Sequence, residues 1–268
     1  MKNTEKKTIF SMYDLRKSFP NPSREGEYFE AIAGLSLEIF ESETTLIAGA
    51  NGSGKTLLMK ILAGLMEPSQ GKILYCGEPI EKSKNLLRRS VGLVFQDPDA
   101  QILGETVEED IRFGPENLKM PKEKIDRITK ETLAALNLST KKDFPSRHLS
   151  GGEKRRLAVA GILAMGCDTI IMDEPFANLD WPGVLQVLNI ISTLKQQKKT
   201  LIILTHELEK VLAFADRLII LADGKLRDDG ASEDVLNRLD PAWGVRDPRG
   251  HYRSAADCTW VPLKQSDK

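Results

Sequence analysis

Short apolar runs and longer amphipathic stretches alternate along most of this 268-residue chain. Several runs are rich in β-branched residues and show no alternation with polar positions, a pattern typical of strands buried on both faces of a parallel sheet. These runs lie at 91–95, 169–172, 201–204 and 218–221. Before residue 45 the pattern differs, because apolar and polar side chains alternate over residues 35–39, as on a half-buried antiparallel strand.

Helical patterns separate the predicted strands. Residues 121–137 and 183–195 carry apolar side chains at helical spacing with charges elsewhere. The stretch from about 97 to 165 has no strand pattern and predicts an inserted α-helical subdomain. The chain is therefore expected to be an α/β protein with a mainly parallel sheet, an antiparallel β part at the N-terminus and this helical insertion. Residues 241–268 show no clear period and are interpreted as a short appendage.

A glycine-rich loop lies between the predicted strand 45–48 and the predicted helix 57–65. It fits the P-loop pattern of a Gly, four residues and then Gly-Lys-Thr. The residues expected to hold a nucleotide here are Gly49, Asn51, Gly52, Ser53, Gly54, Lys55, Thr56 and Leu57. Backbone N–H groups at a helix start attract phosphate, Lys55 adds a positive charge, and Thr56 offers a hydroxyl to Mg²⁺. The loop predicts a P-loop NTPase core that binds ATP and Mg²⁺.

Two carboxylates end the buried run 169–172. Asp173 is expected to hold Mg²⁺, directly or through water, because a carboxylate at the end of the strand beside a P-loop lies next to the bound metal. The next carboxylate, Glu174, is expected to face the γ-phosphate and act as a general base on the attacking water.

A second anion-binding helix start follows Leu149. Ser150 is a good N-cap, and Gly151 and Gly152 give a ligand close access to the backbone. One nucleotide has no obvious need for both helix starts of the same copy. Two copies placed head to tail would share two nucleotides, each between the P-loop of one copy and the Ser-Gly-Gly turn of the other.

Composition limits the remaining possibilities. Hydrophobic residues make up 41% and charged residues 29%, and the formal net charge of −1 gives no global basic field for nucleic acid. The chain shows neither a long apolar run for a transmembrane helix nor a signal peptide, so a cytoplasmic protein is expected. Cys76, Cys167 and Cys258 form no CxxC pair, and Cys76 and Cys167 are interpreted as inert core thiols.

Together the motifs resemble those of ABC-type ATPases over roughly residues 8–235, which predicts an ATPase domain at 8–240. In that family the Ser150-Gly151-Gly152 segment, with Glu153, is the signature that binds the other copy's nucleotide. The resemblance implies that Gln96 contacts Mg²⁺ and the water and senses the membrane partner. It also implies that Asp180 lies at the dimer seam. His206 would contact the γ-phosphate and act with Glu174, Gln96 and Lys55 in hydrolysis.

A narrower resemblance links residues 96–102, 106–118 and 154–161 to the ATPases of energy-coupling factor (ECF) transporters, including cobalt-type and nickel-type importers. It implies a second ABC ATPase subunit, identical or paralogous, and a transmembrane coupling protein. It further implies a separate membrane protein that captures a vitamin or a metal ion. The expected location is the cytoplasmic face of the cell membrane, as a peripheral protein with no nucleic-acid partner.

Several residues depart from the family pattern. Leu57 replaces a Thr, Lys154 replaces a Gln, Trp181 replaces a Pro, and Asn178 is unusual before Leu179-Asp180. These departures place the hydrolysis rate in question more than the fold. The aromatic that stacks on adenine is expected to be Phe19, with Tyr28 or Phe29 as alternatives.

Two other functions fit parts of the sequence. One is a soluble ABC ATPase acting on ribosomes or DNA, although the chain has one ATPase unit, no heptad run and no basic stripe. The other is a weakly active scaffold in a heterodimeric ATPase pair, suggested by the residues that depart from the pattern. His148, His251 and the basic cluster at 82–89 are interpreted as having no site role. The cargo has no signature in this chain.

Overall fold

The computed structural model describes residues 6–21, 23–24 and 26–250. Within these residues a four-stranded sheet has the order β2-β1-β4-β5 and a six-stranded sheet the order β10-β9-β3-β8-β7-β6. The first comprises β1 (Thr8–Pro20), β2 (Tyr28–Phe40), β4 (Gln70–Tyr75) and β5 (Glu78–Pro79). The second comprises β3 (Thr44–Ala48), β6 (Val91–Val94), β7 (Thr169–Asp173), β8 (Thr200–Thr205), β9 (Arg217–Ala222) and β10 (Lys225–Ala231).

The strand pairings explain the two sequence patterns. β3, β6, β7, β8 and β9 run parallel to their partners, and only the edge pair β9–β10 of this sheet is antiparallel among the described strands. All pairs of the smaller sheet are antiparallel. The parallel strands β3, β7 and β8 end at Ala48, Asp173 and Thr205, which lie at one edge of the sheet next to the predicted motif residues.

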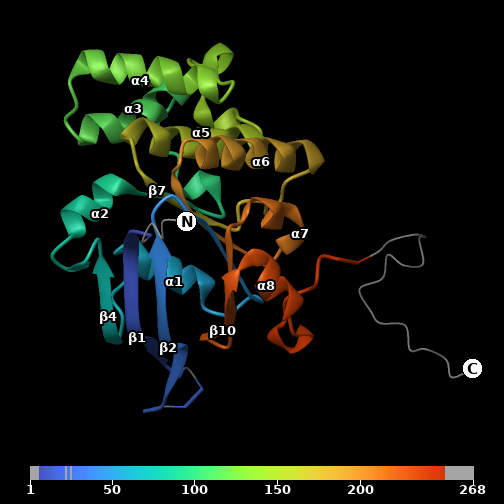
Figure 1. Ribbon diagram of the computed structural model, residues 1–268. Coiled ribbons are helices and arrows are strands. Elements are labelled where there is room, and N and C mark those ends of the chain that lie inside the picture. Colours follow the sequence, from blue (N-terminus) through green and yellow to red (C-terminus); the bar gives the residue numbers. More distant parts are fainter. Residues whose placement is uncertain (1–5, 22, 25, 251–268) are drawn as a thin grey trace, which may run out of the picture.

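The α-helices pack against the larger sheet or, as α4 does, on other helices. They are α1 (Lys55–Leu62), α2 (Lys84–Ser90), α3 (Val107–Asn117), α4 (Lys122–Ala135), α5 (Gly151–Met165), α6 (Trp181–Gln196), α7 (Leu208–Val211) and α8 (Ser232–Asn237). Figure 1 shows α3, α4 and α5 stacked at the top of the view with α6 beside α5, while β1, β2 and β4 lie at the other end. None of these helices is both long and apolar enough to span a bilayer, within the residues described.

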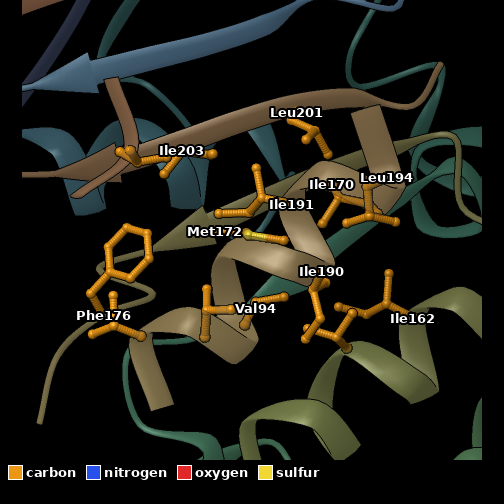
Figure 2. Packing of buried hydrophobic residues seen from close by; sticks show 14 of the residues in the cluster. Val94, Ile162, Ile170, Met172, Phe176, Ile190, Ile191, Leu194, Leu201 and Ile203 are labelled. Atoms are coloured by element: carbon orange, nitrogen blue, oxygen red, sulfur yellow. The ribbon is translucent and has the colours of Figure 1, made fainter. Parts of the chain in front are cut away.

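Two apolar cores lie on opposite faces of the six-stranded sheet. Leu201 and Ile203 of β8 belong to the core shared with α5 and α6, and Ile202 and Leu204 belong to the core shared with α1 and the smaller sheet. Figure 2 shows side chains of β6, β7, β8, α5 and α6 meeting in the first core. Because both faces of β8 are covered, its sequence has no polar alternation.

The predicted fold class is confirmed: the chain is α/β, with a mainly parallel sheet, an antiparallel sheet formed largely by N-terminal strands, and helices at 107–165. The helix after the glycine loop begins two residues earlier than expected, at Lys55. The β4–β5 hairpin was not predicted. The predicted helices 121–137 and 183–195 correspond to α4 and α6.

The interpretation of Cys76 as a core thiol is wrong. Cys76 follows β4 in the turn of the hairpin, with φ of 50°, and its side chain is exposed. Alternation along β4 buries Tyr75 and turns the next residue outward. Cys167 is buried as predicted, and burial raises the pKa of its thiol to about 11. Cys258 and His251 lie outside the described residues.

Candidate functional site

The glycine loop is packed so closely that two of its positions exclude a side chain. A Cβ at Gly49 would lie 2.2 Å from the Leu221 carbonyl and 2.5 Å from Ser53 Oγ. Gly54 has φ of 100°, and a Cβ there would lie 2.9 Å from the Ala31 carbonyl. The loop therefore packs tightly between β3 and α1, and the first residues of α1, Lys55, Thr56 and Leu57, line a cavity.

Lys55 is held in place by its own loop. Its Nζ donates to the carbonyls of Gly49 at 2.7 Å and Ala50 at 3.2 Å, and it lies 3.6 Å from Glu174 Oε1. The residue is 5% exposed. Burial lowers the pKa of Lys55, while the carboxylates of Glu174 and Asp173 oppose that shift. A phosphate entering the cavity would supply the negative charge that this buried ammonium otherwise finds only in the two acids.

Asp173 has one oxygen paired and one oxygen free. Thr56 Oγ1 donates to Asp173 Oδ2 at 3.0 Å, and Asp173 Oδ1 is buried without a hydrogen-bond partner. Burial raises the pKa of Asp173, the charge of Glu174 raises it further, and the Thr56 hydroxyl and Lys55 oppose the rise. Hydroxyl and carboxylate oxygens are the hard ligands that Mg²⁺ prefers. The residues present therefore fit this metal.

The protein supplies only part of such a metal site. No group of three or more His, Cys, Asp or Glu side chains able to hold a metal occurs among the described residues. A Mg²⁺ ion at Thr56 and Asp173 would take its other ligands from phosphate oxygens and water, as is usual for this metal. Metal and nucleotide are thus expected to bind together.

Replacing Asp173 by Asn is expected to stabilise the free chain and to remove the Mg²⁺ dependence of ATP binding. Because the folded-state pKa of Asp173 is raised, the free energy of unfolding falls as pH rises from 3.8, the ordinary value, through the raised one. That cost is fully present at a pH above the raised pKa. Removing the buried charge should therefore raise the free energy of unfolding by about 1 kcal/mol at pH 7.

Urea unfolding of the metal-free and nucleotide-free Asp173→Asn variant, followed by ATP titration with and without Mg²⁺, measures both effects. Asp168→Asn provides the control, because Asp168 precedes the same strand but pairs with Lys199 on the surface. A variant less stable than the parent, or one whose ATP affinity still rises with Mg²⁺, would contradict the assignment.

Glu174 is oriented by the end of the neighbouring strand. Its Oε2 accepts from Thr205 Oγ1 at 2.9 Å and from the His206 N–H at 3.4 Å, and its Oε1 lies 3.0 Å from His206 Nδ1. Its main chain has φ of 45°, and its N–H donates to the Leu204 carbonyl. The carboxylate is thus fixed by several contacts before any ligand enters.

Lys55, Thr56 and Glu174 line one cavity of about 230 Å³, and Asp173 is bonded to Thr56 at its wall. Its lining contains most of the expected phosphate-binding and hydrolytic residues, namely Asn51, Gly52, Gly54, Lys55, Thr56, Leu57, Gln96, Glu174 and His206. Gln96 enters from the end of β6, and its side chain is exposed. A P-loop, a carboxylate with an unpaired oxygen and an oriented acid beside an imidazole are suited to binding and cleaving a triphosphate.

Comparison with known proteins agrees with this geometry. A family model described as ABC transporter matches residues 32–177. A putative ABC transporter ATP-binding protein of Halobacterium salinarum is 42% identical over 218 residues, which make up 81% of this chain and 94% of that protein. The chain belongs to the ABC transporter family. It is an ATPase of that family and binds ATP.

Two further similarities concern particular members. The energy-coupling factor transporter ATP-binding protein EcfA of Methanocaldococcus jannaschii is 38% identical, over 78% of this chain and 76% of that protein. The structure of cbiO1 from Clostridium perfringens, described as part of the ABC transporter complex cbiONQ, superposes with a TM-score of 0.76 at 32% identity. That match covers 86% of this chain and 91% of the other. The resemblance to ECF-type ATPases is confirmed.

The residues predicted to form the signature line a second hollow of about 450 Å³. Ser150, Gly151, Gly152, Glu153 and Asp180 all line it, and none of them lines the P-loop cavity. Ser150 and Glu153 form a reciprocal cap at the start of α5, with the Glu153 carboxylate accepting from the Ser150 N–H at 2.9 Å. Lys141, bonded to Glu153, lowers the pKa of that carboxyl.

The backbone of residues 178–180, which line this hollow, accounts for one unusual residue. Asn178 has φ of 58°, in the left-handed region that Asn tolerates better than most residues. Asp180 caps α6 by accepting from the Gly183 N–H at 2.9 Å. Trp181 is the first residue of α6 and is 71% exposed. The departures at Asn178 and Trp181 therefore leave the local fold intact.

Phe19 lies near the end of β1, and it lines neither hollow. Its ring centroid is 5.9 Å from that of Phe29 on the paired strand, and Lys17 Nζ lies 5.4 Å from the same ring. Tyr28 is 71% exposed. The structure does not bring these aromatics to the P-loop cavity, so adenine stacking by Phe19 stays a prediction.

Sequence reasoning missed two residues of the site. Thr205 orients Glu174, and its place between a buried strand and the expected histidine is the signal that indicates it. Arg155 is 3% exposed and contacts the main chain of Gln96, Glu174 and Ala177. No local pattern marks Arg155, because it lies in a helix with other basic residues on either side.

Proposed function

We propose that this ABC ATPase powers a membrane importer of the ECF type that takes up a vitamin or a transition-metal ion. The observation that carries the proposal is the P-loop cavity, where Lys55, Thr56, Glu174 and His206 converge and Thr56 is bonded to Asp173. The similarity to EcfA of Methanocaldococcus jannaschii and to cbiO1 of Clostridium perfringens supports the transporter type. The chain would act at the cytoplasmic face of the membrane.

Hydrolysis would use the orientation of Glu174. Thr205 and the His206 main chain hold one carboxylate oxygen, and the other faces His206 Nδ1 and Lys55. A γ-phosphate would take over the Lys55 ammonium, which leaves the Glu174 carboxylate free to accept a proton from the attacking water. His206, with its exposed ring, would then donate to the γ-phosphate. Gln96 would contact the same water from the edge of the cavity.

Thr56 and Asp173 would hold Mg²⁺, with Gln96 as a further contact. When bound, the ion would neutralise charge on the phosphate oxygens during cleavage. The unpaired Asp173 Oδ1 supports this role, because a buried carboxylate oxygen without a partner favours a cation beside it.

The two separate hollows support a head-to-tail pair of ATPase subunits. In each composite site the P-loop of one subunit would face the Ser150–Glu153 turn and Asp180 of the other. Such a pair would close when ATP binds and reopen after hydrolysis, which is the motion an importer needs. A transmembrane coupling protein and a substrate-capture membrane protein would complete the complex. The convergence of all hydrolytic residues favours an active subunit over a scaffold.

Replacing Lys55 by Ala tests the proposal at its first step. The variant should bind Mg²⁺-ATP about 10–100-fold more weakly, because a charge-assisted hydrogen bond to phosphate contributes about 1.5–3 kcal/mol. Calorimetric titration of the purified chain measures the change. Lys60→Ala, in the last turn of the same helix α1, is the matched control and should bind ATP normally. Undiminished ATP affinity in Lys55→Ala would refute the assigned site.

The transport role has its own experiment. Affinity purification of the tagged chain from detergent-solubilised membranes should recover a second ATPase subunit, a polytopic coupling protein and a small membrane capture protein. Recovery of ribosomal proteins or DNA instead would favour a soluble ABC ATPase and overturn the importer assignment.

A further inference from the structure

Arg155 is a buried cation in the second turn of α5, between the two hollows. It is 3% exposed, and its Nε is buried without a hydrogen-bond partner. Burial lowers the pKa of its guanidinium, and the charge of Asp97 opposes that shift. Burying an Arg is costly unless its donors are used, so the contacts it makes are informative.

Those contacts are three main-chain carbonyls from two separate loops. One terminal nitrogen donates to Gln96 at 3.0 Å and to Ala177 at 3.3 Å, and the other donates to Glu174 at 3.5 Å. Gln96 follows β6, whereas Glu174 and Ala177 both lie in the loop between β7 and α6. A planar guanidinium suits this task, because its donors are fixed in one fork and point in several directions at once.

The Glu174 peptide needs such support. Its φ of 45° is unusual for a residue with a side chain, and a backbone of this kind persists only where its surroundings hold it. The Glu174 N–H donates to the Leu204 carbonyl, and Arg155 donates to the Glu174 carbonyl. Glu174 places its carboxylate at the P-loop cavity, and Arg155 of α5 holds the main chain of the same residue.

The same helix begins at the signature hollow. Ser150 caps α5, and Gly151 and Gly152 form its first turn. Two more contacts tie α5 to the segment after β6: Lys154 pairs with Asp99 at 2.6 Å, and Gln101 donates to the Ala158 carbonyl at 3.1 Å. If α5 shifts, residues 96–101 are therefore expected to move with it.

We infer that Arg155 is a positioning residue that links the phosphate-binding start of α5 to the main chain of Gln96 and Glu174 in the same subunit. A nucleotide bound at the signature turn of one subunit would in this way set the hydrolytic geometry of that subunit's own P-loop cavity. The inference rests on the proposed ATP hydrolysis by a head-to-tail pair, and it adds a physical connection between the two sites.

The first test needs no nucleotide. Hydrogen–deuterium exchange of Arg155→Met is expected to show faster exchange than the parent in peptides covering 95–101 and 174–180. Arg217→Met is the matched control, because Arg217 is also largely buried but pairs with Asp229 at the far end of the larger sheet. A general effect of losing a buried Arg would raise exchange in both variants. Faster exchange in the two named peptides is expected only in Arg155→Met.

The second test uses turnover. Arg155→Met should lower kcat per folded molecule by about tenfold or more, with KM for ATP within about threefold of the parent and a less cooperative dependence of rate on ATP concentration. Arg155→Lys should recover part of kcat, since it keeps the charge but reaches fewer carbonyls. If Arg155→Met does not fold, the kinetics of Arg155→Lys provide the test instead.

The outcomes separate the inference from the proposed function. Unchanged exchange in both loops, or kinetics of Arg155→Met that match those of Arg217→Met, would overturn the role of Arg155. A parent chain that hydrolyses ATP without any cooperativity would overturn the link between sites. A parent chain with no ATPase activity would instead refute the proposed function, and the exchange result would still decide whether Arg155 holds the loops.

Discussion

Glu174→Gln is expected to bind Mg²⁺-ATP as tightly as the parent chain while its kcat falls by about 10²–10⁴-fold. Gln keeps the shape of the side chain and an oxygen that can accept from Thr205 and the His206 N–H. It cannot take a proton from water at neutral pH. The loss therefore isolates general-base catalysis, since binding depends on Lys55, Thr56 and the glycine loop.

Phosphate release and calorimetric ATP binding, measured on the same preparation, check this result. Glu209→Gln is the matched control, because Glu209 is an exposed carboxylate in α7, three positions after His206. It should leave both quantities unchanged. Turnover by Glu174→Gln within about threefold of the parent would show that another group accepts the proton.

Gly151→Asp should leave the fold and the P-loop of its own chain intact and yet lower turnover by about 10²–10³-fold. A Cβ at Gly151 meets no atom within 4 Å, and an acidic residue in the first turn of a helix is favourable. In a head-to-tail pair the new carboxylate would face the partner's triphosphate. Two like charges about 4 Å apart repel by about 4 kcal/mol near a protein surface, which corresponds to about three orders of magnitude.

The measurement combines thermal unfolding, ATP binding at high dilution and steady-state hydrolysis at high chain concentration. Lys122→Asp is the control, because it also places an acid at the first position of an exposed helix, α4, away from both hollows. A fully active Gly151→Asp variant would argue against nucleotide sharing between subunits. An unfolded variant would contradict the open space above Gly151.

Sequence patterns predicted the parallel strands and the P-loop because both depend on short segments of chain. The sequence patterns that indicate β8 and the loop before α1 each lie within a few consecutive residues. The same locality explains the errors. Cys76 follows an apolar strand but lies in a tight hairpin turn, and the β4–β5 pair is too short and mixed to show a period.

The site was predicted in its parts but not in its connections. Motifs indicated Lys55, Asp173, Glu174 and His206, and the strand order brings them to one edge of the sheet. The contacts of Arg155 are carbonyls up to 59 positions away along the chain, and main-chain acceptors have no sequence signature. The place of Phe19 relative to a bound base also lies beyond what its strand alone determines.

The left-handed backbone at Glu174 has an evolutionary consequence. A side chain in this conformation costs of order 1–3 kcal/mol, and the buried carboxylate beside Asp173 adds electrostatic repulsion. Exchange of this one residue for glycine would relieve both costs and abolish the chemistry, so an inactive descendant would recover part of the stability that it loses with the contacts to Lys55, Thr205 and His206. Gene duplication followed by this single step offers a short route to an asymmetric pair in which one member has lost hydrolysis.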